Sequence, residues 1–233
     1  MRIRLASMAA VGAMAACGNG ALEPGVGSDP GTGTQTLVVD GFAYASPRAG
    51  AAHTGADFDT VFMVRVSLDD QPVTAGSVTV TSATGKVSLT YGDDHRWEAT
   101  ATGYDEVYVL DVVHGSDRAE GVRVDGPDIH VFTEPAENAS IDATIPLVVR
   151  WKAAARAELA TLRIESGPAI AIADDGELTL PAGTLKVDRV QARHHTLHLA
   201  RTNDLTPSGT APGSSWSVSI ENTLDVVTPP LPL

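Results

Sequence analysis

The residues with the most potential for chemistry are three histidines within residues 193–198: His194, His195 and His198. Imidazole nitrogens are common ligands of zinc and other transition metals. The surrounding pattern predicts a strand, in which His194 and His198 share one face while His195 lies on the other with Leu197. Side chains four residues apart on a strand are ~13 Å apart, too far to bind one ion. The sequence therefore favours strand histidines without a metal, and a metal site is the alternative.

Pairs of aspartates could supply oxygen ligands for calcium. Such pairs occur at residues 69–70, 93–94 and 174–175, and Asp57 lies close to Asp59. None of them has the Asp-x-Asp-x-Asp-Gly spacing of a calcium loop. Each pair also lies where a turn is expected, and aspartate is favoured in turns. A role in turns is therefore predicted for these acids, with calcium binding as the alternative.

Motifs that would identify an enzyme are missing from the sequence. It contains no Gly-x-Ser-x-Gly, His-Glu-x-x-His, Gly-x-Gly-x-x-Gly or phosphate-binding P-loop. A Ser-His-Asp triad brought together from separate strands stays open, because its members need not be close in sequence. The expectation is a protein without catalytic residues and without a cofactor.

A single cysteine, Cys17, follows a short basic start and an apolar stretch at residues 5–16. This stretch is too short for a membrane-spanning helix, which takes ~20 residues, but it suits the core of an export signal. One thiol also excludes an intramolecular disulfide and a cysteine-based zinc site.

The segment Met14-Ala15-Ala16-Cys17-Gly18 resembles the lipobox of bacterial lipoproteins. The resemblance implies cleavage before Cys17 and a diacylglycerol thioether on its sulfur, which would hold the mature chain on a membrane. The family prefers Leu where this chain has Met14. Gly18 favours the outer membrane over the inner one. The alternative is an ordinary secretory signal cut at a small-residue site.

The rest of the N-terminal region is rich in Gly, Pro and polar residues, and a flexible tether is expected over residues 17–35. The whole chain carries a formal net charge of −13. An acidic surface repels phosphate backbones, so nucleic acid is not expected as a partner.

From residue 36 onward, apolar and polar residues alternate in short runs that predict half-buried strands. In residues 62–68, for example, Phe62, Val64 and Val66 share one face. Residues 107–113 are apolar on both faces, which predicts a central strand. Further strands are expected at residues 77–81, 86–91, 96–100, 121–125, 129–133, 147–151, 159–165, 177–180, 185–192, 196–201 and 216–224.

Three tryptophans, Trp97, Trp151 and Trp216, could form a sugar-stacking platform. Each alternates in phase with apolar neighbours, however, so all three are predicted to pack in a core.

A break at residues 125–128 divides the strands into two sets, which favours two antiparallel β-sandwiches. Residues 132–140 and 146–151 resemble the opening of immunoglobulin-like modules in bacterial surface proteins. Residues 102–112 are similar to the late strand of such modules, which often carries a corner tyrosine. The predicted all-β chain thus comprises an export signal (1–16), a lipidated tether (17–35) and two immunoglobulin-like domains (36–127 and 128–233).

These features predict a non-enzymatic binding or adhesion module anchored in the bacterial cell envelope, on the periplasmic or surface face of the outer membrane. Its partners would be the membrane, through the lipid, and an envelope protein or glycan. A second hypothesis is a structural subunit of an envelope assembly, docked through residues 107–113 or an open sheet edge. A third is a metal-dependent hydrolase built on His194, His195 and His198.

Overall fold

A computed structural model describes residues 22–230 of the chain; Cys17 and the predicted export signal lie outside them. The described part is all-β, as predicted, and contains no helix long and apolar enough to cross a membrane. A 3-10 turn, η2 (Gly55–Asp57), precedes β3. The strands are β1 (Thr32–Gly33), β2 (Leu37–Pro47), β3 (Phe58–Leu68), β4 (Gln71–Pro72), β5 (Ser77–Ser82), β6 (Gly85–Ser88), β7 (Thr90–Tyr91), β8 (Trp97–Thr102), β9 (Val107–His114), β10 (Asp117–Asp125), β11 (Val131–Glu134), β12 (Ala139–Ser140), β13 (Leu147–Lys152), β14 (Leu159–Ile164), β15 (Ile170–Ile172), β16 (Glu177–Leu180), β17 (Arg193–Leu205) and β18 (Ser215–Thr228).

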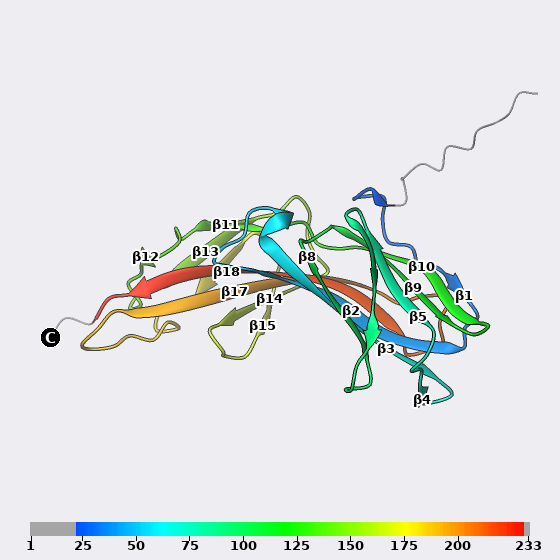
Figure 1. Cartoon of the computed structure of the whole chain (residues 1–233). Helices are drawn as coiled ribbons and strands as arrows, with labels where there is room; N and C mark the ends of the chain where they lie inside the picture. Colours follow the sequence, from blue (N-terminus) through cyan, green and yellow to red (C-terminus); the bar gives the residue numbers. More distant parts are fainter. Residues whose placement is uncertain (1–21, 231–233) are drawn as a thin grey trace, which may run out of the picture.

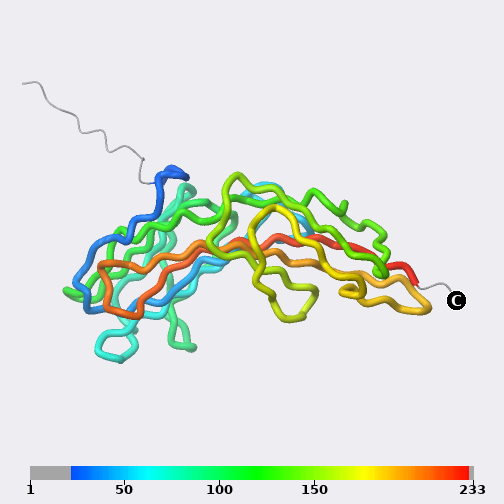
Figure 2. The backbone as a smooth tube through the Cα atoms, turned by 180° about the vertical axis from the view of Figure 1, so that it is seen from behind, coloured from blue at the N-terminus to red at the C-terminus, as the bar shows by residue number. Residues whose placement is uncertain are grey.

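The strands form three sheets in two layers. The large sheet has the order β15-β14-β17-β18-β2-β3-β8-β7, with β12 and β4 attached to it. A five-stranded sheet, β1-β10-β9-β5-β6, covers one half of it, and a three-stranded sheet, β11-β13-β16, covers the other half. The molecule is elongated, and strand β18 ends near the far tip of the second half (Figure 1, Figure 2).

The hairpin of β17 and β18 runs through the large sheet and belongs to both halves (Figure 1). On β18, Trp216 and Ile220 pack in the first core, whereas Leu224 and Val226 pack in the second. These residues are an even number of positions apart, so they lie on one face of the strand. Both cores therefore lie on the same side of the large sheet.

The hairpin joins the first half through a parallel pairing of residues 215–220 on β18 with residues 40–45 on β2. Strand β2 was not predicted, because its core-facing positions include the small residues Gly41, Ala43 and Ala45. A Cβ atom on Gly41 would lie 3.2 Å from the ring of Trp216. The small residue at this position therefore leaves room for the tryptophan.

The two sandwiches do not divide at the predicted boundary between residues 127 and 128. The first core includes Trp216, Val218 and Ile220, with Leu205 packed against it, and all four come from the C-terminal hairpin. Residues 36–127 therefore lack strands that complete their own core. The sandwiches are two halves of one sheet structure and not two separate domains in tandem.

Part of the predicted tether is also ordered, because residues 22–35 lie against the first sandwich. Strand β1 pairs with β10, and Asp29 forms a bridge with Arg123. The backbone N–H groups of Gly25 and Gly27 donate to the carboxylate of Asp125 at 3.0 and 2.9 Å. Composition did not predict this contact because it uses backbone groups and buries little apolar surface.

Residues 185–192, predicted as a strand, form a loop instead. Leu185 is buried, but Val190 is 87% exposed, so the apolar residues of this run do not share a covered face. Residues 153–158, between β13 and β14, also form a loop.

Other predictions for the core are confirmed. Trp97, Trp151 and Trp216 are 6%, 4% and 0% exposed. Strand β9, which contains residues 107–113, lies in the middle of the five-stranded sheet with a partner on each side.

Because β18 contributes to both cores, the two halves should unfold together. Leu224→Ala removes a side chain that is 2% exposed in the second core and should lower the free energy of unfolding by about 2–5 kcal/mol. In a Trp151→Phe background, the fluorescence of Trp97 and Trp216 reports on the first core alone. Leu224→Ala should shift that signal to lower urea concentration. An unshifted signal would show that the halves unfold independently.

Candidate functional site

Strand β17 places the predicted histidines on two faces, as the alternation requires. His195 is 2% exposed on the core side, with Nδ1 2.8 Å from Glu165 Oε1 and Nε2 2.8 Å from the carbonyl oxygen of Lys186. His194 and His198 lie on the outer face, where His198 Nδ1 is 2.8 Å from Glu221 Oε1. Within residues 22–230, no three His, Cys, Asp or Glu side chains are grouped as metal ligands. His195 and His198 are therefore paired with different carboxylates, and the three histidines are not brought to one point.

The aspartate pairs have two different roles. Asp69 and Asp70 form a turn with positive φ angles of 50° and 62°, and residues 93–94 also lie in a turn. Asp57 accepts hydrogen bonds from the backbone N–H groups of His53 and Thr54 beside η2. Residues 173–176 connect β15 to β16, where the turn was expected, but the carboxylate of Asp174 is also buried and ion-paired.

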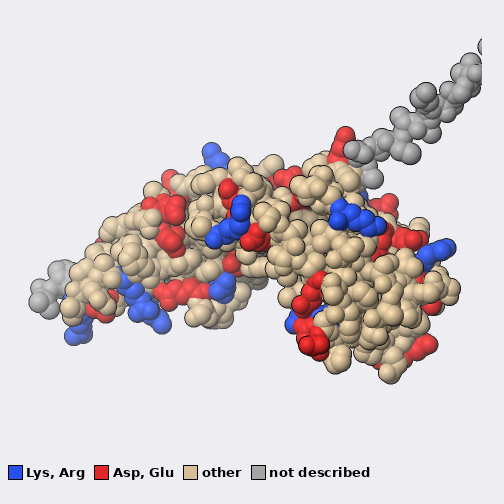
Figure 3. All heavy atoms as spheres, viewed as in Figure 1, with Lys and Arg blue, Asp and Glu red and all other residues tan. Residues whose placement is uncertain are grey.

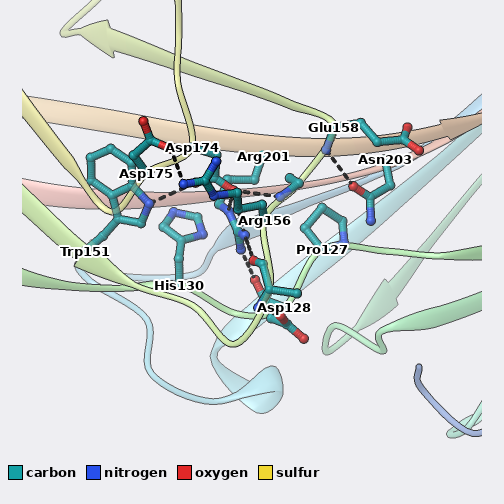
Figure 4. A network of polar contacts seen from close by, with 12 residues as sticks. Pro127, Asp128, His130, Trp151, Arg156, Glu158, Asp174, Asp175, Arg201 and Asn203 are labelled. Carbon is teal, nitrogen blue, oxygen red and sulfur yellow. Dashed lines mark hydrogen bonds and ion pairs between the residues drawn. The ribbon is translucent and has the colours of Figure 1, made fainter.

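The most deeply buried ion pair of the described residues joins Arg201 on β17 to Asp174, between β15 and β16 (Figure 4). The two side chains are 0% and 5% exposed. Arg201 Nη2 and Nε lie 2.8 and 2.9 Å from Asp174 Oδ2. Asp174 also accepts from Trp151 Nε1 at 3.0 Å and from the backbone N–H of Ala157 at 2.7 Å. The carboxylate is therefore fully engaged by fixed donors.

Arg201 also holds two backbone segments. Its Nη1 donates to the carbonyl oxygen of Asp128 at 2.7 Å, and its Nη2 donates to that of Ala155. Asp128 lies between the two halves of the chain, and its carboxylate accepts from the Ala155 N–H at 2.5 Å. One guanidinium thus connects the segment between the halves, the loop after β13 and the segment before β16.

The surroundings of Arg201 set the charge of two titratable groups, Asp174 and His130. Burial opposes ionisation of Asp174, but hydrogen bonds from Arg201, Ala157 and Trp151 outweigh it and hold the pKa of this carboxyl below 3.8. Burial, with the nearby charge of Arg201, lowers the pKa of His130 to about 3. His130 Nε2 donates to the Leu199 carbonyl at 3.0 Å, and Nδ1 has no hydrogen-bond partner among the described residues. His130 is therefore neutral beside a charged ion pair.

Two hollows, the first and second junction hollows, flank the loop after β13. The first, of about 260 Å³, is lined by residues 151–156, residues 174–176 and Arg201. The second, of about 160 Å³, includes Glu106, Asp128 and Asn203, and both are lined by residues 155–156. The buried Arg201–Asp174 pair lies at the inner end of the first hollow. The exposed pair of Arg156 and Asp175, 2.6 Å apart, lies at its mouth.

Larger hollows lie at the far end of the second sandwich. Their volumes are about 570 and 410 Å³, and Ala143, Leu185 and Val187 contribute apolar lining. Among the described residues that line them, none is a deeply buried charged group that could orient a ligand. The first junction hollow combines buried charges, an aromatic edge and an exposed rim, and it is the candidate binding site.

The outer face of the large sheet carries a further polar cluster. Glu221 is 8% exposed and lies 3.2 Å from Arg163 Nη2 as well as next to His198. Burial and the hydrogen bond to Glu221 raise the pKa of Tyr44 well above 10.0. These groups satisfy one another, and they line none of the four hollows described above.

Sequence reasoning missed Arg201 and Asp174. Arg201 lies in phase with Leu197 and Leu199 on the core side of β17, and a charge in that row was the available signal. The sequence offered no comparable signal for Asp174, because Asp174 and Asp175 form an ordinary pair before a glycine.

Comparison with known proteins gives little further information. No protein-family model and no curated protein matches this chain. Among solved structures, it is similar to a "Biofilm associated protein - BSP domain", with 11% sequence identity and a TM-score of 0.25. The match covers 85% of this chain and 30% of that chain, so this chain spans less than a third of the other protein. At this TM-score the similarity carries no argument about function.

Removing Arg201 should strongly destabilise the protein. Arg201→Met leaves the buried Asp174 carboxylate without its counter-ion, which should cost about 3–5 kcal/mol in urea unfolding. Arg201→Met combined with Asp174→Leu should be less destabilised than Arg201→Met alone. Arg156→Met, which removes the exposed pair with Asp175, is the matched control and should change stability little. Equal, small effects of the two single changes would contradict the role assigned to Arg201.

Stability should fall as the pH is lowered below about 6.5. The pKa of His130 is about 3 when folded and 6.5 when unfolded, so the unfolded chain binds the extra proton between these values. The expected slope for this proton approaches about 1.4 kcal/mol per pH unit. Asp174 adds to this loss of stability only below about pH 3.8, because its pKa is lower in the folded protein than in the unfolded chain. Unfolding at pH 7 and pH 5 should show the loss, and His130→Phe should reduce it. An unchanged slope in that variant would exclude His130 as the source.

Proposed function

We propose that this protein is a non-enzymatic binding module of the bacterial cell envelope, with the first junction hollow as its ligand site. The observation on which the proposal rests is that Arg201 and Asp174 hold together the two loops that line that hollow, residues 153–156 and 174–176. Both partners of the ion pair are engaged by other groups of the chain, so they fix the shape of the hollow. Preformed hollows between packed units, with a few fixed polar groups, are typical of ligand sites.

The ligand would be an envelope glycan or a segment of an envelope protein. Arg156 and Asp175 are 76% and 51% exposed at the mouth, where they can exchange their mutual contact for polar groups of a ligand. Nucleic acid is a poor candidate because the chain carries a net charge of −13. On the face in view, the basic side chains are few and lie among acidic ones (Figure 3).

Membrane attachment through Cys17 is the second part of the proposal and rests on the lipobox-like sequence. Residues 18–21 separate Cys17 from the described chain, so the attachment point lies at most ~18 Å from it. Because residues 22–35 lie on the first sandwich, that sandwich would be close to the membrane surface. The second sandwich would extend away from it, on the periplasmic or surface side of the outer membrane.

The structural-subunit hypothesis is favoured by a different observation. Strand β9 is paired on both sides and offers no edge for docking, but β15 has an unpaired edge. Association through such an edge is compatible with a binding module.

Filling the first hollow should abolish binding. Ala154 lines it and is exposed, so Ala154→Trp should block it without disturbing a core. Ala83→Trp, at an exposed turn between β5 and β6, is the matched control. Each immobilised variant would be incubated with polysaccharide and with detergent-solubilised protein from bacterial envelopes. The amount of polysaccharide or protein that it retains would then be measured. Retention by the native chain and Ala83→Trp, with loss in Ala154→Trp, is expected. Equal retention by all three would place the ligand elsewhere.

Attachment is tested by the intact mass of the protein recovered from a bacterial membrane fraction. A mature chain that begins at Cys17 and carries a lipid is expected, and Cys17→Ala should remain unprocessed or be released. An unlipidated mature chain would contradict the anchor and leave the binding proposal to be judged on the hollow alone.

A further inference from the structure

The large sheet ends in an uncharged strand edge that the described residues leave open. Strand β15 pairs with β14 on one side only and lies at the end of the sheet order (Figure 1). With its neighbours Ala169 and Ala173 it forms a run of five uncharged residues. Natural sheets normally block such edges with a charge, a proline or a very short strand, because exposed backbone groups can pair with another chain.

The other sheet edges carry such protection. Strand β16 begins with Glu177, and β11 ends with Glu134. Strand β6 carries Lys86, and β1 and β7 have two residues each. Strand β15 is short as well and is flanked by Pro168 and Asp174, but the strand itself contains neither a charge nor a proline.

The apolar layer beneath the large sheet continues to the edge of β15. Ile170 pairs with Leu162, and Ile172 pairs with Ala160, so both isoleucines lie on the core-facing side. Ile172 packs against the second core. Ile170 is 49% exposed, although its strand partner Leu162 is 1% exposed. One more strand beside β15 would cover Ile170.

The sequence of this edge complements itself. Residues 169–173, Ala-Ile-Ala-Ile-Ala, are the same in both directions. An antiparallel pairing about a two-fold axis at Ala171 places Ile170 of one copy opposite Ile172 of the other. Every opposing pair is then uncharged, and the alanines allow close approach. A second copy of this chain therefore supplies the matching strand by symmetry alone.

We propose that two copies of the chain pair through their β15 edges and join their large sheets into one continuous sheet. The contact is short, so the dimer is weak in dilute solution. The net charge of −13 on each copy opposes approach, and added salt screens this repulsion. Salt should therefore strengthen the dimer. On a membrane, anchored copies would meet at a higher local concentration; that last point alone rests on the proposed anchor.

The test is sedimentation velocity of the full chain, with Cys17→Ser in every sample, from low micromolar to submillimolar concentration at low and high salt. A dimer fraction that rises with protein and with salt is expected. Ile170→Lys should abolish it. Thr179→Lys, on the edge strand β16 of the same sandwich, adds the same charge at an exposed position and should leave the dimer intact.

Cross-linking locates the contact. In the Cys17→Ser background, Ala171→Cys provides a single thiol that the two-fold axis brings to its own symmetry mate, so oxidation should give a disulfide-linked dimer. Thr179→Cys should give much less. A chain that stays monomeric in every condition and is not cross-linked at residue 171, or a dimer that survives Ile170→Lys or weakens in salt, would overturn the proposal.

Two further results are informative. A monomer that captures a different envelope protein through β15 would also overturn self-pairing and would assign the edge to that partner. The dimer test uses substitutions on β15 and β16 and not Ala154→Trp, so a failed ligand site leaves this test unaffected, and the reverse also holds.

Discussion

The junction of this protein depends on a charged residue in a position that the strand pattern reserves for an apolar one. A buried guanidinium without partners costs several kcal/mol, so the chain must bring acceptors to Arg201. It does so with the Asp174 carboxylate and the carbonyl oxygens of Asp128 and Ala155. These acceptors lie on three separate segments, and satisfying one side chain fixes all three. The hollows beside the hairpin have their shape for this reason.

Period-two alternation was sufficient to predict the all-β class and the burial of the three tryptophans, because those strands carry large apolar residues on one face. The central place of β9 followed from apolar residues on both of its faces. It failed where the core is built from small residues. Gly41, Ala43 and Ala45 on β2 carry no visible apolar pattern, and their use becomes clear only when Trp216 lies against them. The division into two domains failed for a related reason. The pattern predicts strands but not that one strand serves two cores.

The candidate site shows the same limit. The faces of His194, His195 and His198 followed from the alternation, but their carboxylate partners, Glu165 and Glu221, come from other parts of the chain. Arg201 was detectable as a charge within an apolar row. Its partner lies 27 residues away, and no local feature distinguishes Asp174 from Asp175. Pairing across strands is decided by topology, which a single sequence does not reveal.

The parallel pairing of β2 with β18 has a mechanical consequence. Strand β2 follows the N-terminal segment, and β18 ends at the opposite tip of the molecule. Tension between those two ends pulls the paired strands lengthwise in opposite directions. All hydrogen bonds between residues 40–45 and 215–220 then bear the load together, in shear, instead of opening one after another as in a peeled hairpin. The fold is therefore built to resist pulling along its long axis.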